Sequence, residues 1–189
     1  MKKILFLICL LFLSTTIIAR STMNYTDKKI NGAFGLKLGE ALTDSLTTKI
    51  SAKKYILSES KQEDENTEYE VIPPEPFSKF QRYFITVCDK NKKIIAIKAF
   101  FKSDNYAETY NLLQFTTQLI INKYGTFEYG NQYSEDGISS SALIVEKNLS
   151  GKGILIWCKQ NTLGITYMDF SLFKRQNDEN KKNEDGYNL

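Results

Sequence analysis

The stretch IIAIKAFF (residues 94–101), followed closely by YAETYNLLQFTTQLIINKYG (residues 106–125), decides the fold of this chain. The first run is apolar at nearly every position, which is typical of a strand inside a sheet with both faces covered. In the second run, apolar residues recur every three or four positions, which indicates an amphipathic helix. The sequence therefore predicts a central strand that leads directly into one long helix.

Both ends of the long helix carry residues that cap helices. Asn105 followed by Glu108 imitates a capping box at the start. Lys123 in the last turn and Gly125 just beyond it supply the usual stop. We therefore place the long helix at about residues 105–124.

Shorter patterned runs on either side of this pair predict the other elements. A shorter N-terminal helix is expected at about residues 40–50. Short polar breaks between the apolar runs favour hairpins over crossovers. The chain is thus predicted to be α+β, with the long helix packed across a mainly antiparallel sheet. The predicted strands cover residues 34–38, 53–58, 67–72, 80–88, 93–101, 142–147, 153–159 and 163–173.

The last predicted strand has two faces of different character. Thr166 and Met168 belong to the more consistently apolar face, whereas Ile165 and Tyr167 share the other face with Asp169. Successive side chains of a strand point to opposite sides of a sheet. We therefore expect the face that carries Thr166 and Met168 to lie in the core.

The chain divides into four parts. Residues 1–19 have two lysines, an apolar run and a small-residue end, which predicts a signal peptide; an uncleaved membrane anchor is the alternative. Residues 20–31 form a polar lead-in, and residues 174–189 form a charged tail that is expected to be disordered. Residues 32–173 are predicted to be a single α+β domain. This domain can be split into two similar halves, about 32–101 and 102–173, each a helix followed by a meander.

The composition excludes several function classes. The chain has no histidine, which removes Ser-His-Asp and Cys-His catalysis and His-based zinc sites. It has no phosphate-binding glycine loop. We therefore predict no catalytic residue, no metal ligand and no cofactor, although carboxylate, Lys, Tyr or Cys chemistry stays open. The formal net charge of +3 includes Lys2 and Lys3, so the exported chain is near +1, which argues against nucleic acid as a partner.

An aromatic segment follows the long helix. Residues 126–140 are predicted to be an irregular loop that carries Phe127, Tyr129 and Tyr133. Exposed rings of this kind are typical of sugar-binding and protein-binding surfaces, so these three residues are the candidate binding site. Alternatively, the rings pack the loop onto the end of the sheet.

All three prolines lie in the segment 73–76, which must be extended. We interpret it as a stiff connector between the elements before and after it; a rigid lip around a site, or a peptide-like ligand, are the alternatives.

Two cysteines remain after removal of the signal peptide. Cys88 and Cys158 each lie near the end of a predicted strand. In an exported chain two cysteines more often pair than not, so a Cys88–Cys158 disulfide is predicted. If their strands are not neighbours, both residues are buried small hydrophobes.

The segment FGLKLGEAL (residues 34–42) resembles the opening of many small exported bacterial α+β proteins. The tandem of helix-plus-meander units resembles the topology of β-lactamase-inhibitor proteins. This resemblance and the lack of catalytic motifs predict an exported, non-enzymatic binding protein, inhibitor-like or envelope-associated. It would be periplasmic or secreted, would have no membrane span once the signal is removed, and would bind another envelope or extracellular protein. A small-ligand or carbohydrate-binding module, or a hydrolase that uses only carboxylates, is the alternative.

Overall fold

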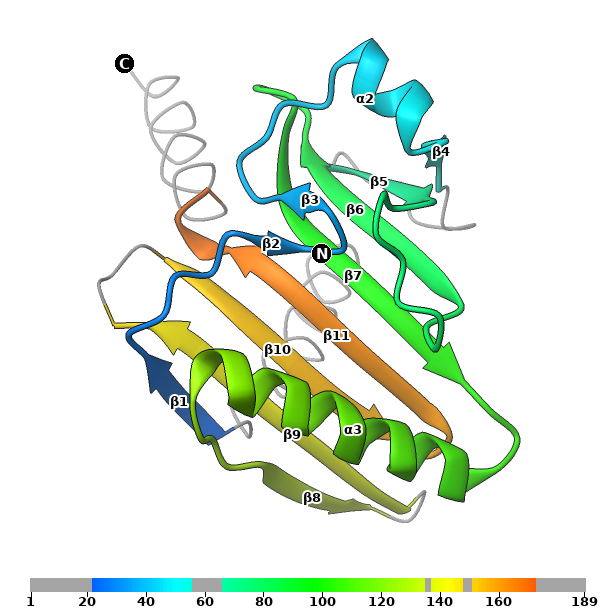
Figure 1. Cartoon of the computed structure of the whole chain (residues 1–189), viewed down its shortest axis with the longest axis vertical. Helices are drawn as coiled ribbons and strands as arrows, with labels where there is room; N and C mark the ends of the chain where they lie inside the picture. Colours follow the sequence, from blue (N-terminus) through cyan, green and yellow to red (C-terminus); the bar gives the residue numbers. More distant parts are fainter. Residues whose placement is uncertain (1–21, 56–65, 135–136, 148–150, 173–189) are drawn as a thin grey trace, which may run out of the picture.

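The computed structural model describes residues 22–55, 66–134, 137–147 and 151–172. The predicted signal peptide and the charged tail lie outside these residues. Figure 1 shows a twisted sheet with the long helix α3 across one face. The elements, in chain order, are β1 (Thr22–Thr26), β2 (Gly32–Ala33), β3 (Leu36–Lys37), α2 (Asp44–Lys49), β4 (Lys53–Lys54), β5 (Asn66–Val71), β6 (Arg82–Cys88), β7 (Lys93–Lys102), α3 (Tyr106–Tyr124), β8 (Gly130–Ser134), β9 (Gly137–Glu146), β10 (Lys152–Lys159) and β11 (Thr162–Asp169).

The described strands form one large sheet and one small hairpin. The large sheet has the order β1-β9-β10-β11-β7-β6-β5-β4, with β8 also paired to β9, and β2 pairs with β3. The β1–β9 pair is parallel, and the other described pairs are antiparallel. The fold is therefore α+β, and its sheet is largely antiparallel, as predicted. Strands β4–β7 follow α2, strands β8–β11 follow α3, and the two sets meet at the β7–β11 pair.

The long helix has the caps that its sequence predicts. The side chain of Asn105 accepts a hydrogen bond from the backbone N–H of Ala107, and Gly125 ends the helix at φ 96°. The N-terminal helix α2 is shorter than the predicted 40–50. The chain before it contacts β7 instead, through a bridge from Ala41 to Lys93 and a backbone bond from Leu42 to Lys92.

Two edge segments differ from the sequence-based expectation. The predicted polar lead-in contains β1, which pairs with β9 although it has few apolar residues. Thr26 donates a side-chain hydrogen bond to the carbonyl of Tyr124 at 2.6 Å, so polar groups hold this strand beside the helix end. The predicted irregular loop 126–140 contains β8 and the start of β9, which pair as a hairpin. Polar edge strands lack the apolar alternation on which strand prediction relies.

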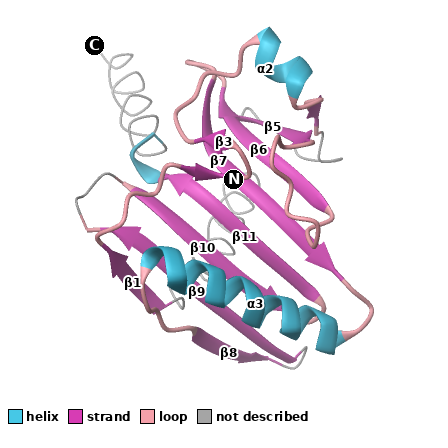
Figure 2. Ribbon diagram, viewed as in Figure 1, coloured by secondary structure: helices cyan, strands magenta, loops and turns pink. Residues whose placement is uncertain are grey.

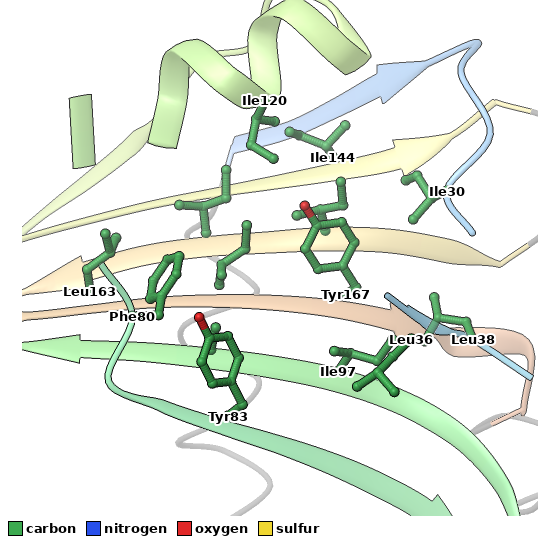
Figure 3. Close-up of a cluster of buried hydrophobic side chains, with 14 of the residues drawn as sticks. Ile30, Leu36, Leu38, Phe80, Tyr83, Ile97, Ile120, Ile144, Leu163 and Tyr167 are labelled. Carbon is green, nitrogen blue, oxygen red and sulfur yellow. The ribbon is translucent and has the colours of Figure 1, made fainter. Parts of the chain in front are cut away.

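The core lies between the sheet and the layer formed by α3 and the β2–β3 hairpin. Figure 3 shows Ile97, Leu163 and Tyr167 on the sheet and Ile120 on α3 within this cluster. In β11 it is the face of Ile165 and Tyr167 that lies in the core, so the expected assignment of that strand's faces is wrong. The opposite face of the sheet carries none of the described helices (Figure 2).

Candidate binding surfaces

A groove lies between α3 and the segment that follows the prolines. Its volume is about 570 Å³, which is within the usual range of ligand sites. Its lining is mainly apolar and includes two charged residues, Lys79 and Glu108. The lining residues are Phe77, Ser78, Lys79, Phe101, Glu108, Asn111, Leu112 and Phe115.

One wall of the groove, residues 73–79, is here named the proline rim. The backbone N–H of Glu75 donates to the carbonyl of Phe34 at 3.1 Å, which ties the rim to the β2–β3 hairpin. The hydroxyl of Tyr83 donates to the carbonyl of Phe77 at 2.6 Å, which ties it to β6. Proline removes backbone freedom between these points. The segment thus connects β5 to β6 and is also a fixed wall of the groove, which combines two of the interpretations above.

The other wall is one flank of α3. The ring of Phe115 is 51% exposed and stacks on Phe77, with centroids 5.8 Å apart and ring planes within 4°. The opposite flank of the helix carries Tyr106 and Tyr110, which stack on each other at 6.2 Å. Tyr110 is 46% exposed and does not line the groove. The helix therefore presents exposed rings on two flanks, but only one flank faces a preformed groove.

The two charged residues that line the groove differ in their partners. The carboxylate of Glu108 accepts a hydrogen bond from the hydroxyl of Ser103 at 2.6 Å. Lys79 has no hydrogen bond or ion pair with any residue that the structure describes. An apolar groove with an uncommitted ammonium group in its lining favours a ligand that is apolar and carries a negative group.

The structure places the predicted aromatic site differently. Phe127 is 8% exposed, and Tyr129 is half-buried, with its hydroxyl 2.7 Å from that of Thr117 on α3. The rings of Phe127 and Tyr129 contact each other edge to face at 5.4 Å. Phe127 and Tyr129 thus pack against the fold, which is the alternative given above for this aromatic segment. Tyr133 lies in β8, and its side chain is outside the described part of the chain.

The buried state of Tyr129 predicts a loss of stability in alkali. Burial raises the pKa of Tyr129 to about 12, although its bond with Thr117 acts in the opposite direction. An unfolded tyrosine has a pKa near 10, so between about pH 10 and 12 the unfolded chain releases a proton that the folded chain keeps. The free energy of unfolding should therefore be unaffected by this group below about pH 10 and fall above it. Urea titrations across this pH range measure the effect: the free energy of unfolding should fall less in Tyr129→Phe than in wild type, by about 1 kcal/mol. Identical pH profiles of the two proteins would contradict the raised pKa of Tyr129.

The two cysteines do not pair. Both Cys88 and Cys158 are free and buried. Cys158 lies on β10 and Cys88 on β6, and the sheet order places β11 and β7 between these strands. A disulfide needs Cα atoms within about 7 Å, whereas neighbouring strands are already about 4.8 Å apart. The predicted disulfide is therefore wrong in this structure, and both residues are buried small side chains.

The sheet face away from α3 carries a row of aromatic rings that sequence reasoning missed. Tyr55, Phe84, Phe100 and Trp157, here named the aromatic face, follow one another across β4 to β10. Their successive ring centroids are 5.1, 5.6 and 6.0 Å apart. In each of β6, β7 and β10, one aromatic residue (Phe84, Phe100 or Trp157) stands beside a core position and points to the opposite face of the strand. No pattern within one strand reveals that such positions line up.

Paired charges border the aromatic face. Arg82 bonds Glu70 at 2.8 Å, and Lys98 bonds Glu68 at 2.6 Å. Together with Tyr55, Phe84 and Phe100, three of these residues, Glu68, Arg82 and Lys98, line a second hollow of about 270 Å³. The guanidinium of Arg82 also lies 4.8 Å from the centroid of Phe84, which covers that ring.

Several of the described carboxylates are engaged in structural roles. The hydrogen bond from Arg82 lowers the pKa of Glu70, which keeps this group ionised rather than able to donate a proton near neutral pH. Asp169 accepts from the backbone N–H of Ser171 and Leu172. Within the described ranges, no three metal-ligating side chains gather in one place.

Comparison with known proteins identifies no relative of this chain. No protein-family model matches the chain, and no curated protein or solved structure is significantly similar to it. Among the described helices, none combines the length and apolar character needed to cross a membrane.

Proposed function

We propose that this chain is an exported, non-enzymatic binding protein, inhibitor-like or envelope-associated, that recognises a partner polypeptide in the groove beside α3. The observation that carries the proposal is a preformed apolar groove in which Phe115 stays half exposed against a fixed partner ring, Phe77. Exposed apolar surface in a concave site typically marks a contact with another molecule. The resemblance to small exported bacterial proteins and the predicted signal peptide support export; residues 1–19 lie outside the described chain.

The groove favours one kind of partner segment. Phe77, Phe101 and Phe115 offer ring surfaces to a large apolar side chain, which would displace water from them. Lys79, which also lines the groove, would bind a carboxylate next to that side chain. We therefore expect the recognised segment to carry an aromatic or large aliphatic residue beside Asp, Glu or a chain terminus.

The rigidity of the proline rim supports affinity. A site that is fixed before binding loses less conformational entropy when its partner arrives. The bonds to Phe34 and from Tyr83 hold the rim at Glu75 and Phe77, on either side of Pro76. A partner therefore has to order its own segment, but not the groove.

Peptide selection tests this proposal. Random displayed peptides are selected on the wild-type protein and depleted on Phe115→Ala. Enriched peptides should carry an apolar residue beside an acidic one. Because a buried ring at the centre of an interface typically contributes about 1–4 kcal/mol, Phe115→Ala should weaken their binding by about tenfold or more. Lys79→Gln should weaken binding of the acidic peptides and reduce its dependence on salt.

Tyr110→Ala is the matched control, because Tyr110 is a similarly exposed ring on the other flank of the same helix. It should change affinity by less than about twofold. Equal losses in the Phe115 and Tyr110 variants would overturn the groove as the site. Failure to enrich any peptide, together with Phe115-dependent binding of a free apolar carboxylate such as decanoate, would favour the small-ligand alternative instead.

A further inference from the structure

Two aromatic rings flank a glycine on the aromatic face. Gly164 on β11 pairs with Trp157 on β10 and with Phe100 on β7. A Cβ atom at Gly164 would lie 2.3–2.5 Å from Cε2, Cζ2 and Nε1 of the indole, so this ring occupies the space above the glycine. The two ring centroids are 6.0 Å apart, and both side chains are partly exposed. The missing side chain at residue 164 therefore makes room for a platform of rings.

Two lysines flank a threonine in the next row of the same face. Thr162 pairs with Lys159 on β10 and with Lys102 on β7. Residues two positions apart on a strand point to the same side of the sheet, so this row lies on the face of the two rings. Both lysines are exposed, and neither ammonium group has a hydrogen bond or ion pair with any residue that the structure describes. The hydroxyl of Thr162 also has no partner within the described ranges.

The other cations next to the rings are already neutralised. Arg82 and Lys98, which neighbour Phe100 on the side away from this row or on β6, form ion pairs with carboxylates at 2.8 and 2.6 Å. The uncompensated positive charge beside the rings is thus carried by Lys102 and Lys159. Their strands are separated by β11, so their Cα atoms are roughly 10 Å apart. The flexible four-carbon stem of lysine allows both ammonium groups to reach one anion from these positions.

We propose that these two rows bind a nucleoside monophosphate. The base would stack on the outer face of the indole of Trp157, with Phe100 beside it. The phosphate would lie between the ammonium groups of Lys102 and Lys159 and accept a hydrogen bond from Thr162. The two rows are about 7 Å apart along the strands, which leaves space for the sugar between base and phosphate.

The proposed site is distinct from the cavities described above. It lies beside the second hollow, which Phe100 lines and Trp157 does not. None of its residues lines the groove beside α3. The proposal therefore does not depend on the partner polypeptide proposed above.

The arrangement of charge selects this ligand over other anions. A phosphate monoester carries nearly two negative charges near neutral pH, which matches two ammonium groups, whereas a carboxylate carries one. In an acidic sugar the carboxylate is attached to the ring that would stack, so platform and cations would fall in one row rather than two. A nucleic acid strand needs cations along its backbone, but Arg82 and Lys98 are already paired. The surface therefore matches one base and one terminal phosphate.

The protein contains a single tryptophan, so its fluorescence reports directly on the platform. Adenosine 5′-monophosphate is titrated to about 10 mM, because one stacked base and one phosphate contact correspond to a dissociation constant on the order of 1 mM. It should quench the emission saturably, isothermal calorimetry should give the same affinity, and added salt should weaken binding. Adenosine and inorganic phosphate should each bind at least about tenfold more weakly, because each makes only part of the contacts. No saturable change with the nucleotide, or equal affinity for either fragment, would overturn the proposal.

Two further ligands test the selectivity of the site. Decadeoxyadenylate with hydroxyl ends offers the same base without a terminal phosphate, and trigalacturonate offers an acidic saccharide. Both should bind more weakly than adenosine 5′-monophosphate when affinity is expressed per nucleotide or per sugar unit. Tighter binding of the oligonucleotide would overturn the proposal in favour of a nucleic acid strand, and tighter binding of trigalacturonate would overturn it in favour of an acidic saccharide.

Variants test the two rows separately. The double variant Lys102→Gln, Lys159→Gln should reduce nucleotide affinity to that of adenosine, without shifting the emission of the free protein or changing peptide binding in the groove. Lys93→Gln is the matched control, because Lys93 is an exposed lysine at the opposite end of β7, and it should change affinity by less than about twofold. Gly164→Ala should displace the indole, shift its emission and weaken nucleotide binding by about tenfold or more. If Gly164→Ala unfolds the chain, the double lysine variant still decides the question: undiminished nucleotide affinity in it would contradict the assigned phosphate contacts.

Discussion

Replacing Ile165 with alanine should reduce the free energy of unfolding by about 2–5 kcal/mol, the usual cost of removing a large buried aliphatic side chain. Ile165 is 2% exposed and lies on β11, where the two halves of the sheet meet. Its ladder partner on β7 is Ala99, which is too small to fill the cavity, and its partner on β10 is Ile156. Because β11 is paired with β10 on one side and with β7 on the other, the neighbouring side chains can move only a little into the cavity that the substitution leaves.

Urea unfolding followed by far-UV circular dichroism measures this loss. Leu119→Ala is the control, because it removes a similar side chain from an exposed position on α3. It should cost less than about 1 kcal/mol. A loss below about 1 kcal/mol in Ile165→Ala would mean that the β7–β11 junction is not the centre of the core. A change in the urea m-value without a change in midpoint would point to an altered denatured state instead.

Gly32→Ala should be the second strongly destabilising change, at about 2 kcal/mol or more. Gly32 has φ +146°, and a Cβ there would lie 2.1 Å from the backbone carbonyl oxygen of Leu36. That oxygen belongs to the facing strand of the β2–β3 hairpin, so the clash cannot be relieved by a side-chain rotation. The hairpin would have to open, which would withdraw Phe34 from its contact with Tyr83 and loosen the proline rim.

Gly39→Ala separates the clash from the cost of the backbone conformation. Gly39 also has a positive φ, +82°, but a Cβ there would meet nothing within 4 Å. Its alanine variant should lose only about 1 kcal/mol, the penalty for an L-residue in this region. Urea midpoints of the two variants give the comparison. Equal losses would show that steric contact with Leu36 adds nothing, and the described geometry of the hairpin would then be contradicted.

The sequence predicts the elements that carry strong local signals. The helix α3 combines apolar periodicity with caps at both ends, and β7 is a long apolar run, so each could be placed within a few residues. These signals arise within a single element and need no knowledge of its neighbours. The α+β class follows from their combination with the short polar breaks between strands.

Features that depend on neighbours could not be predicted in the same way. β1 is a polar strand, held by side-chain bonds from Thr26 and Asn24 to segments about a hundred residues away. In β11 both faces carry apolar residues, because one covers the core and the other belongs to the sheet face that bears Trp157. Alternation alone therefore identified the wrong face of that strand.

The groove and the aromatic face were missed for a related reason. Phe77, Phe101 and Phe115 come from three separate segments, and each is an ordinary apolar residue in its own segment. The aromatic segment 126–140 was more conspicuous because its rings are close in sequence, but Phe127 and Tyr129 pack against the fold. Rings that are adjacent in sequence stabilise their own segment here, whereas rings that the fold brings together leave an accessible surface.

Photo-crosslinking in cells that produce the protein tests the groove as the recognition site most directly. The photo-reactive residue p-benzoylphenylalanine is placed at position 115 or, as a control, at position 110, and adducts are identified by mass spectrometry after irradiation. Position 115 should yield a discrete adduct with a second polypeptide, which position 110 does not form and which Phe77→Ala diminishes. Adducts that form equally from both positions, or that are insensitive to Phe77→Ala, would contradict the proposal that this protein binds its partner in the groove.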